Sequence, residues 1–207
     1  MARKPLMAGN WKMNNTYAEA VVLAQTISNN FDKHWTDSVD VLVCPPSIDL
    51  KPVNMVFEFD HQPIQIGAQN VYWEPKGAFT GEVSVPMLKD VHCTCSIVGH
   101  SERRGYFGET NEDVNRKVRA LLDGGLYAVA CVGESLSVRD EGGAEEFVCA
   151  QVRAAFAGLE PEEAGKCVVA YEPIWAIGTG RTATPEQAQD MCAAIRATLA
   201  DMFGAET

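Results

Sequence analysis

Six short apolar runs recur along this 207-residue sequence, separated by polar turns and longer amphipathic stretches. The runs are nearly continuous rather than alternating, which is typical of strands buried on both faces of a parallel sheet. We therefore predict six strands, over Leu6–Ala8, Val39–Cys44, Ile64–Ala68, Cys95–Val98, Ala128–Val132 and Cys167–Ala170. The amphipathic stretches predict helices, most clearly over Tyr17–Ser28, Asn111–Leu122, Glu145–Phe156 and Pro185–Met202.

This alternation predicts an α/β fold of six strand–helix units with right-handed crossovers. A doubly wound sheet and a TIM-type (β/α)8 barrel both suit the pattern. The turn after the first strand lacks Gly-x-Gly-x-x-Gly, which disfavours the dinucleotide-binding version of the doubly wound fold. No linker or tandem repeat divides the chain, so we predict a single domain over residues 1–207.

Composition excludes several classes of function. Lys and Arg number 17 against 28 Asp and Glu, and a net charge of -11 disfavours nucleic-acid binding. No run reaches the ~20 apolar residues of a membrane span, and the N-terminus lacks the apolar core of a signal peptide. We therefore predict a cytoplasmic protein that does not bind membranes.

The seven cysteines are odd in number and lie mostly in apolar runs, which indicates reduced, buried thiols. Cys93 and Cys95 with the adjacent His92 raise the possibility of a zinc site. Their spacing is unlike that of a four-ligand site, so we favour structural thiols and predict no metal.

Polar side chains follow three of the predicted strands. Asn10 and Lys12 come after the first strand, His100 and Glu102 after the fourth, and Glu172 after the sixth. In either α/β architecture, function lies beyond the carboxyl ends of the strands. One cation, one imidazole and one carboxylate suit the transfer of a proton on a small anionic substrate.

Each of these residues also has a structural interpretation. Lys12 could be a surface lysine, His100 a hydrogen-bonded core histidine, and Glu102 a partner of the amino end of the next helix. Glu172 follows an apolar run and precedes Pro173. A carboxylate in that position is costly unless it is paired or used, which favours a functional role.

Residues 173–181, Pro-Ile-Trp-Ala-Ile-Gly-Thr-Gly-Arg, have stiff apolar ends and a tip of small residues. This composition suits a lid whose ends absorb a rotation, and glycine N–H groups at its tip could contact an anion. A static turn before the helix at Thr184 explains the segment equally well.

Several motifs, in order along essentially the whole chain, resemble the triosephosphate isomerase family. Each motif alone is weak, whereas the ordered set is very specific. The matching segments are Gly9-Asn10-Trp11-Lys12, Gly67-Ala68-Gln69-Asn70, Gly77-Ala78-Phe79-Thr80-Gly81-Glu82, Gly99-His100-Ser101-Glu102-Arg103-Arg104, Cys131-Val132-Gly133-Glu134, and Ala170-Tyr171-Glu172-Pro173 with the Gly178-Thr179-Gly180 tip.

The resemblance implies an isomerase that interconverts dihydroxyacetone phosphate and D-glyceraldehyde 3-phosphate without a cofactor, in glycolysis and gluconeogenesis. Glu172 would be the base that moves a proton between adjacent carbons, and His100 the electrophile that hydrogen-bonds the substrate oxygens. Lys12 would hold the substrate, with Asn10 beside it. Because a helix start is predicted at Ser101, its peptide dipoles should disfavour imidazolium at His100.

The resemblance assigns supporting roles to other positions. Glu102 would be the acid that follows the histidine, and Cys131 a structural thiol near the site. Residues 173–181, with Gly178 at the tip, would form the closing loop. For the aromatic loop from Val71 to Glu82, the resemblance implies an interface in a homodimer, in which Thr80 approaches the site of the partner.

The sequence departs from the family in length. A (β/α)8 barrel usually takes ~250 residues, whereas this chain ends after its sixth unit, so we expect an incomplete barrel with exposed edges at the first and sixth strands. Two alternatives to an active isomerase follow. One is an inactive fragment, and the other is a short variant that acts only as a binding or assembly module.

A phosphate-handling aldolase is a further alternative, and it requires a Schiff-base lysine inside an apolar strand. Neither Lys12 nor Lys166 is in such a place, because the first follows a strand and the second precedes one.

Overall fold

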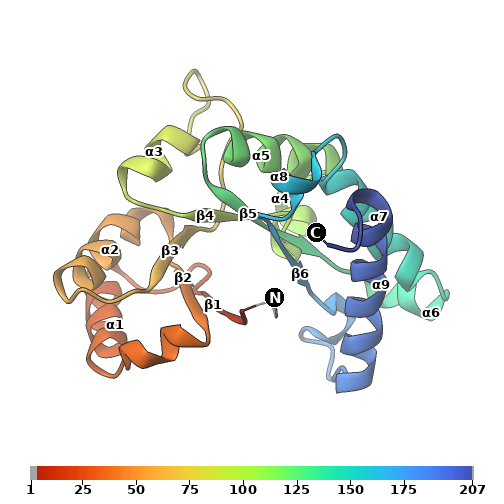
Figure 1. Cartoon of the computed structure of the whole chain (residues 1–207), viewed down its shortest axis with the longest axis horizontal. Coiled ribbons are helices and arrows are strands. Elements are labelled where there is room, and N and C mark those ends of the chain that lie inside the picture. Colours follow the sequence, from red (N-terminus) through yellow and green to blue (C-terminus); the bar gives the residue numbers. More distant parts are fainter. Residues whose placement is uncertain (1–3, 207) are drawn as a thin grey trace. The chain divides into compact units, whose positions relative to one another are not determined.

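The computed structural model describes residues 4–206. These residues fall into two compact units. The first holds the chain through Ile97 together with Asp123–Leu126, and the second holds Val98–Leu122 together with the chain from Tyr127 onward. Strands and helices alternate along both units, as Figure 1 shows.

In the first unit the strands are parallel and are neighbours in chain order. They are β1 (Leu6–Asn10), β2 (Asp40–Cys44), β3 (Gln65–Ala68) and β4 (Cys95–Val98), with Val98 already in the second unit. Leu6 lies opposite Asp40, Leu42 opposite Gln65, and Gly67 opposite Cys95. A doubly wound sheet reverses its strand order beside the first strand, so this order identifies the barrel-type alternative.

Three α-helices and two 3-10 turns complete the first unit. Helix α1 packs on α2, which also contacts β3, so both helices cover the same side of these strands (Figure 1). A capping box between Thr16 and Glu19 begins α1. The elements are α1 (Tyr17–Asn29), η1 (Lys33–Asp37), η2 (Ser47–Asp49), α2 (Leu50–Phe59) and α3 (Val85–Asp90).

In the second unit, β5 (Tyr127–Val132) and β6 (Val168–Tyr171) pair in parallel. Helix α7 packs on β5, and α9 packs on α7. Thr184 caps α9 through its side chain, and Pro185 occupies the first turn, as predicted. The helical elements are α4 (Ser101–Phe107), α5 (Asn111–Asp123), α6 (Leu136–Asp140), α7 (Ala144–Ala155), α8 (Pro161–Ala164), η3 (Ile174–Ala176) and α9 (Pro185–Phe203).

The six predicted strands are present within a residue or two of the expected bounds, so the fold is α/β of the TIM barrel type, with six βα units in the described chain. The expectation that every strand is buried on both faces is wrong for β1, where Met7 is 63% exposed. In the described chain β1 pairs only with β2, and an edge strand has less packing around it. No helix within residues 4–206 is long and apolar enough to span a membrane.

Candidate active site

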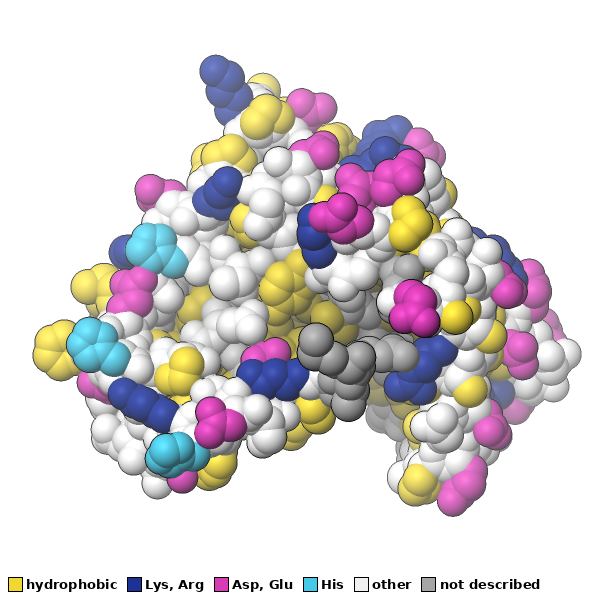
Figure 2. Space-filling model, in the orientation of Figure 1, with side chains coloured by type: hydrophobic (Ala, Val, Ile, Leu, Met, Phe, Trp, Pro, Cys, Tyr) yellow, Lys and Arg dark blue, Asp and Glu magenta, His cyan; other side chains and the backbone are white. Residues whose placement is uncertain are grey.

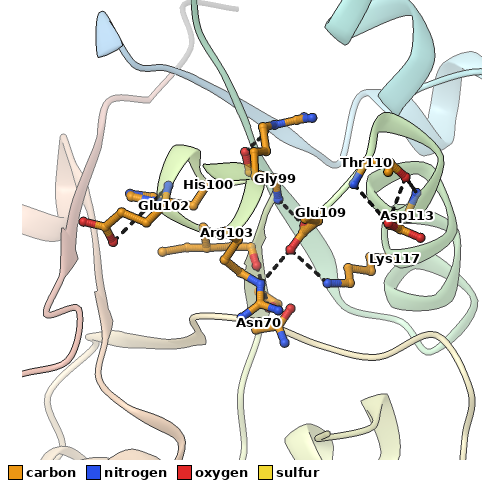
Figure 3. A network of polar contacts seen from close by, with 12 residues as sticks. Asn70, Gly99, His100, Glu102, Arg103, Glu109, Thr110, Asp113 and Lys117 are labelled. Atoms are coloured by element: carbon orange, nitrogen blue, oxygen red, sulfur yellow. Dashed lines mark hydrogen bonds and ion pairs between the residues drawn. The ribbon is translucent and has the colours of Figure 1, made fainter. Parts of the chain in front are cut away.

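His100 projects from the turn between β4 and α4. It occupies the N-cap position of α4, and its side chain is 10% exposed. Its Nδ1 accepts a hydrogen bond from the backbone N–H of Glu102 at 3.2 Å, and a Glu102 carboxylate oxygen lies 3.6 Å from the same nitrogen. Figure 3 shows Glu102 beside the imidazole.

Glu172 is the first residue after β6. Its backbone N–H donates to the carbonyl of Val132 at 2.8 Å, which extends the pairing of β6 with β5. Gly133 makes this approach possible, because a Cβ there would lie 2.1 Å from the Glu172 carbonyl oxygen. The carboxylate is 16% exposed; its Oε1 lies 2.9 Å from His100 Nε2, and its Oε2 accepts from the Ser101 N–H at 2.9 Å.

These contacts define the protonation of the pair. Because His100 Nδ1 accepts a hydrogen bond, the ring proton is on Nε2, which donates to Glu172. Burial raises the pKa of the Glu172 carboxyl, but the hydrogen bonds from His100 and Ser101 outweigh burial and hold this pKa below its ordinary value. The pair is therefore a neutral imidazole that donates to a carboxylate.

The peptides on both sides of Gly99 are held by charged side chains. The Gly99 N–H donates to Glu109 Oε1 at 2.7 Å, and the Gly99 carbonyl accepts from Arg104 Nε at 2.7 Å. Gly99 has a φ of 71°, a left-handed conformation that glycine adopts without strain. The residue that precedes His100 in the chain is thus fixed from both directions.

Glu109 is the centre of a buried ion cluster, shown in Figure 3. Its Oε2 lies 2.6 Å from Arg103 Nε and 3.1 Å from Lys117 Nζ, and only 2% of the Glu109 side chain is exposed. Burial raises the pKa of Glu109, but the charge of Lys117 and the donors around the carboxylate bring it below its usual value. Sequence reasoning missed this cluster, although Lys117 shares the buried face of α5 with Val114 and Leu121.

Cys131, in β5, is buried. Burial, with the nearby Glu172 carboxylate, raises the pKa of its thiol far above the ordinary range. The thiol is therefore protonated and non-nucleophilic.

Residues 173–181 combine one buried anchor with an exposed tip. Trp175 is 4% exposed, and the Arg139 guanidinium carbon lies 4.3 Å from its ring centroid. The tip is exposed, and Gly178 and Gly180 have φ values of 69° and 77°. Thr179 Oγ1 donates to the Trp175 carbonyl at 2.7 Å, which closes the tip on itself.

A second buried carboxylate, Glu134, lies under this segment and was assigned no role from sequence. Its Oε1 accepts from Arg139 Nη1 at 2.9 Å and from the Tyr171 hydroxyl at 3.0 Å. Burial is the main factor that raises the pKa of Tyr171, to about 12, so this hydroxyl stays a donor. Glu134 follows the fifth strand, in Cys131-Val132-Gly133-Glu134. This position beyond a strand end was the sequence signal that could have identified it as a site residue.

In the first unit, Asn10 and Lys12 form a tight turn after β1. Asn10 Oδ1 accepts from the Lys12 N–H at 3.0 Å, and the Lys12 carbonyl accepts from Gln69 Nε2 at 2.9 Å. Gln69 also donates to the Cys44 carbonyl at 2.8 Å. Lys12 has a φ of 55°, which costs energy for a residue with a Cβ and persists only where surrounding contacts fix it.

Thr80 is exposed in the loop that contains a stacked aromatic group. The rings of Tyr72 and Trp73 lie 4.1 Å apart, and those of Tyr72 and Phe79 lie 4.5 Å apart. The Tyr72 N–H donates to the Val83 carbonyl, which closes the base of the loop. Within residues 4–206, no three His, Cys, Asp or Glu side chains lie close enough together to hold a metal ion.

The fold is that of the (β/α)-barrel class, and the contact between His100 and Glu172 beyond its strand ends suits acid–base chemistry. Residues 5–207 match the family described as triosephosphate isomerase. Triosephosphate isomerase from Chloroflexus aurantiacus is 52% identical over 204 residues, which cover 99% of this chain and 80% of that relative. The enzyme of that name from Saccharopolyspora erythraea is 48% identical over 206 residues, which cover 100% of this chain and 79% of that relative.

The chain thus spans about four-fifths of the length of these relatives. It belongs to the triosephosphate isomerase family. It is therefore an isomerase, and its reaction is the interconversion of dihydroxyacetone phosphate and D-glyceraldehyde 3-phosphate. The alternative of a binding or assembly module without this chemistry is not favoured.

Proposed function

We propose that Glu172 is the catalytic base of this isomerase and that His100 is its electrophile. The observation that carries the proposal is the 2.9 Å contact between His100 Nε2 and Glu172 Oε1. A carboxylate beside a neutral N–H donor can take a proton from carbon while the donor stabilises charge on the adjacent oxygen.

The reaction then proceeds through an enediolate. Glu172 removes a proton from the hydroxymethyl carbon of dihydroxyacetone phosphate, and the electron pair moves onto the carbonyl oxygen. His100 donates a hydrogen bond from its Nε2–H to that oxygen. Glu172 returns its proton to the adjacent carbon, and the hydroxyl proton passes between the two oxygens. Every atom of the substrate is retained, and no cofactor is needed.

Glu172 must change partners to do this work. Its two carboxylate oxygens contact His100 Nε2 and the Ser101 N–H, so both positions are occupied. Substrate oxygens that bind His100 compete for the first contact. We infer that the carboxylate rotates away from Ser101 and toward the substrate carbon when the site fills.

Substrate binding is assigned to Lys12, Asn10 and Gly178. The Lys12 ammonium neutralises an anionic substrate, and the hydrogen bond from Asn10 supports the Lys12 turn. Glycine N–H groups at the tip of residues 173–181 contact the phosphate when this segment closes as a lid. Excluding water in this way protects the enediolate from losing its phosphate. Glu102 and Cys131 support the site without entering the reaction.

We further propose a homodimer in the cytoplasm, with Thr80 at the interface. The aromatic group of Tyr72, Trp73 and Phe79 on a loop supports this, because aromatic residues are enriched at interfaces. Nucleic acid is not proposed as a partner. On the face seen in Figure 2, Lys and Arg side chains are scattered among acidic ones, and the net charge is -11.

The substitution Glu172→Asp tests the base. Shortening the side chain by one methylene leaves the charge but moves the carboxylate by about 1 Å, so kcat should fall about 100-fold in a coupled isomerase assay. Binding of 2-phosphoglycolate, whose carboxylate resembles the enediolate, should weaken far less. Equal losses in kcat and in this binding would contradict the assignment.

The aldolase alternative is tested separately. Borohydride with substrate traps a Schiff base as a stable adduct, and mass spectrometry should find no adduct on Lys12 or Lys166.

A further inference from the structure

The Arg104 guanidinium binds neutral acceptors and no carboxylate in the described part of the chain. The residue is half-buried on α4, and it donates from Nε to the Gly99 carbonyl at 2.7 Å, from Nη1 to Asn111 Oδ1 at 2.7 Å, and from Nη2 to the Cys131 carbonyl at 3.4 Å. In the described part of the chain no carboxylate oxygen lies within 4.0 Å of it. Arginine that leaves water is normally paired with a carboxylate. Here it holds neutral acceptors, two of which are backbone carbonyls beside the site.

Those two carbonyls belong to the frame of the active site. The Gly99 carbonyl is part of the peptide that contains the His100 nitrogen, and Cys131 lies in β5, which pairs with β6 just before Glu172. Arg104 thus connects the segment that presents the imidazole with the strand pair that presents the carboxylate. Among residues 4–206, its only side-chain acceptor is Asn111, the first residue of α5.

Gly99 cannot be fixed by its own side chain, so its conformation depends on these contacts. A Cβ at Gly99 would lie 2.9 Å from Arg104 Nη2 and 3.0 Å from the Cys131 carbonyl oxygen. Glycine leaves φ and ψ free, and rotation about either bond moves the imidazole of His100. Glu109 restrains the peptide before Gly99, and Arg104 restrains the peptide after it.

We propose that Arg104 is a positioning residue of the isomerase, which fixes the Gly99–His100 peptide and thereby keeps His100 Nε2 aligned with Glu172 and with the substrate oxygens. The proposal rests on the catalytic roles proposed above for His100 and Glu172. Arg104 itself need not touch the substrate. Arg104 contributes to catalysis by fixing the orientation of the His100 imidazole. In the structure this orientation places His100 Nε2 2.9 Å from Glu172 Oε1.

The first test compares Arg104→Ala with Arg116→Ala. Arg116 is also on a helix, but its side chain is half exposed and its guanidinium pairs with the exposed Glu112. Arg104→Ala should lower kcat about 100-fold with a much smaller change in KM, because a misplacement of about 1 Å can cost this much. Arg116→Ala should leave both constants near those of the wild type.

Chemical rescue separates positioning from general destabilisation. Guanidinium at a concentration too low to denature the protein should bind in the space left by Arg104→Ala and restore part of kcat. Urea has the same planar shape but no charge, and it should restore less. Neither additive should raise the activity of the wild type or of Arg116→Ala.

The orientation of His100 is read independently of turnover by nitrogen-15 NMR of labelled histidine. In the wild type the resonances should show a neutral ring with the proton on Nε2, as the contacts of Nδ1 and Nε2 indicate. Arg104→Ala should shift both ring resonances, and guanidinium should partly reverse the shift. Arg104→Lys should also shift them, because one ammonium cannot reproduce three fixed donors.

The outcomes are distinct. A loss of kcat together with shifted His100 resonances supports the proposal, whereas unchanged kcat, or lost kcat with unchanged resonances, overturns it. If Arg104→Ala does not fold, Arg104→Lys gives the same decision, because its aliphatic stem fills most of the space. If His100→Gln is fully active, the proposed function fails, and the NMR shifts still decide whether Arg104 orients His100.

Discussion

The acid–base pair proposed for this isomerase depends on which nitrogen of one histidine holds the proton. His100 Nδ1 is occupied by the Glu102 N–H, so Nε2 is left as the donor to Glu172. The same arrangement keeps Glu172 ionised, because the Nε2–H and the Ser101 N–H stabilise the charged form against the effect of burial. The reactivity of both side chains therefore originates in backbone N–H groups at the start of α4.

The lowered pKa of Glu172 predicts how stability depends on pH. A carboxyl whose pKa is lower in the folded state stabilises the protein above its ordinary pKa, 4.5, and this contribution is lost as pH falls through the folded-state pKa. Between about pH 6 and about pH 3 the wild type should lose more unfolding free energy than Glu172→Gln does. Urea unfolding at several pH values measures both. Parallel curves for the two proteins would show that the pKa is not lowered.

Among the elements, β3 shows most clearly how tightly the strands pack. A Cβ at Gly67 would lie 2.7 Å from Cys95 Sγ and 2.8 Å from Cys44 Sγ, so the sulfur atoms of β2 and β4 fill the space above the glycine. The two cysteines act as packing groups, as their place in apolar runs predicted. A glycine in a strand often marks such a close approach.

Gly67→Ala should therefore destabilise the protein by about 1 to 3 kcal/mol in urea unfolding, because the methyl group has no room. Adding Cys44→Ala and Cys95→Ala should recover part of the loss. The control is Gly105→Ala in α4, where a Cβ meets nothing within 4 Å. It should stabilise the protein by about 0.5 to 1 kcal/mol, since alanine favours a helix. A Gly67→Ala protein as stable as the wild type would refute the packing account.

The sequence predicts the strands because their apolar runs are nearly continuous, and the longer helices because their apolar and polar residues alternate with a helical period. Helix α2 (Leu50–Phe59) escapes prediction because it has a proline, Pro52, near its start. Its exposed side also includes the apolar residues Met55 and Phe59, which obscure the contrast with its buried face. Helix α3 has only six residues. The buried Lys117 depends on Glu109, which reaches it from the loop before α5, and such a pairing is a tertiary property that local patterns do not contain.

At the scale of the whole molecule, the site residues identified from sequence come from both compact units. His100, Glu102, Cys131, Glu172 and Gly178 belong to the second unit, and Asn10, Lys12 and Thr80 belong to the first. The sequence singles out Lys12, His100 and Glu172 because each follows a predicted strand. The roles expected of Cys131, Gly178 and Thr80 come from the family resemblance alone. The meeting of Lys12 with the pair and the prediction of a single domain over residues 1–207 stay predictions, and residues 1–3 and 207 lie outside the described range.

Light scattering tests the proposed dimer. At micromolar concentration the protein should have twice the mass of one chain, and Thr80→Arg should shift it toward the monomer, because a desolvated charge at an interface is costly. The matched control, Thr26→Arg, adds the same charge on the exposed part of α1 and should leave the mass unchanged. A wild-type protein of monomeric mass would contradict the proposal.

The stacking of Arg139 on Trp175 gives this enzyme a built-in optical signal. An indole under a guanidinium at 4.3 Å has its excited state perturbed by the adjacent charge, and the ring is shielded from water. When residues 173–181 move and the ring leaves this position, the indole loses the adjacent charge and becomes exposed to water. In a variant in which Trp11, Trp35 and Trp73 are replaced by phenylalanine, fluorescence from the remaining indole would follow the proposed opening and closing in real time, with no dye attached.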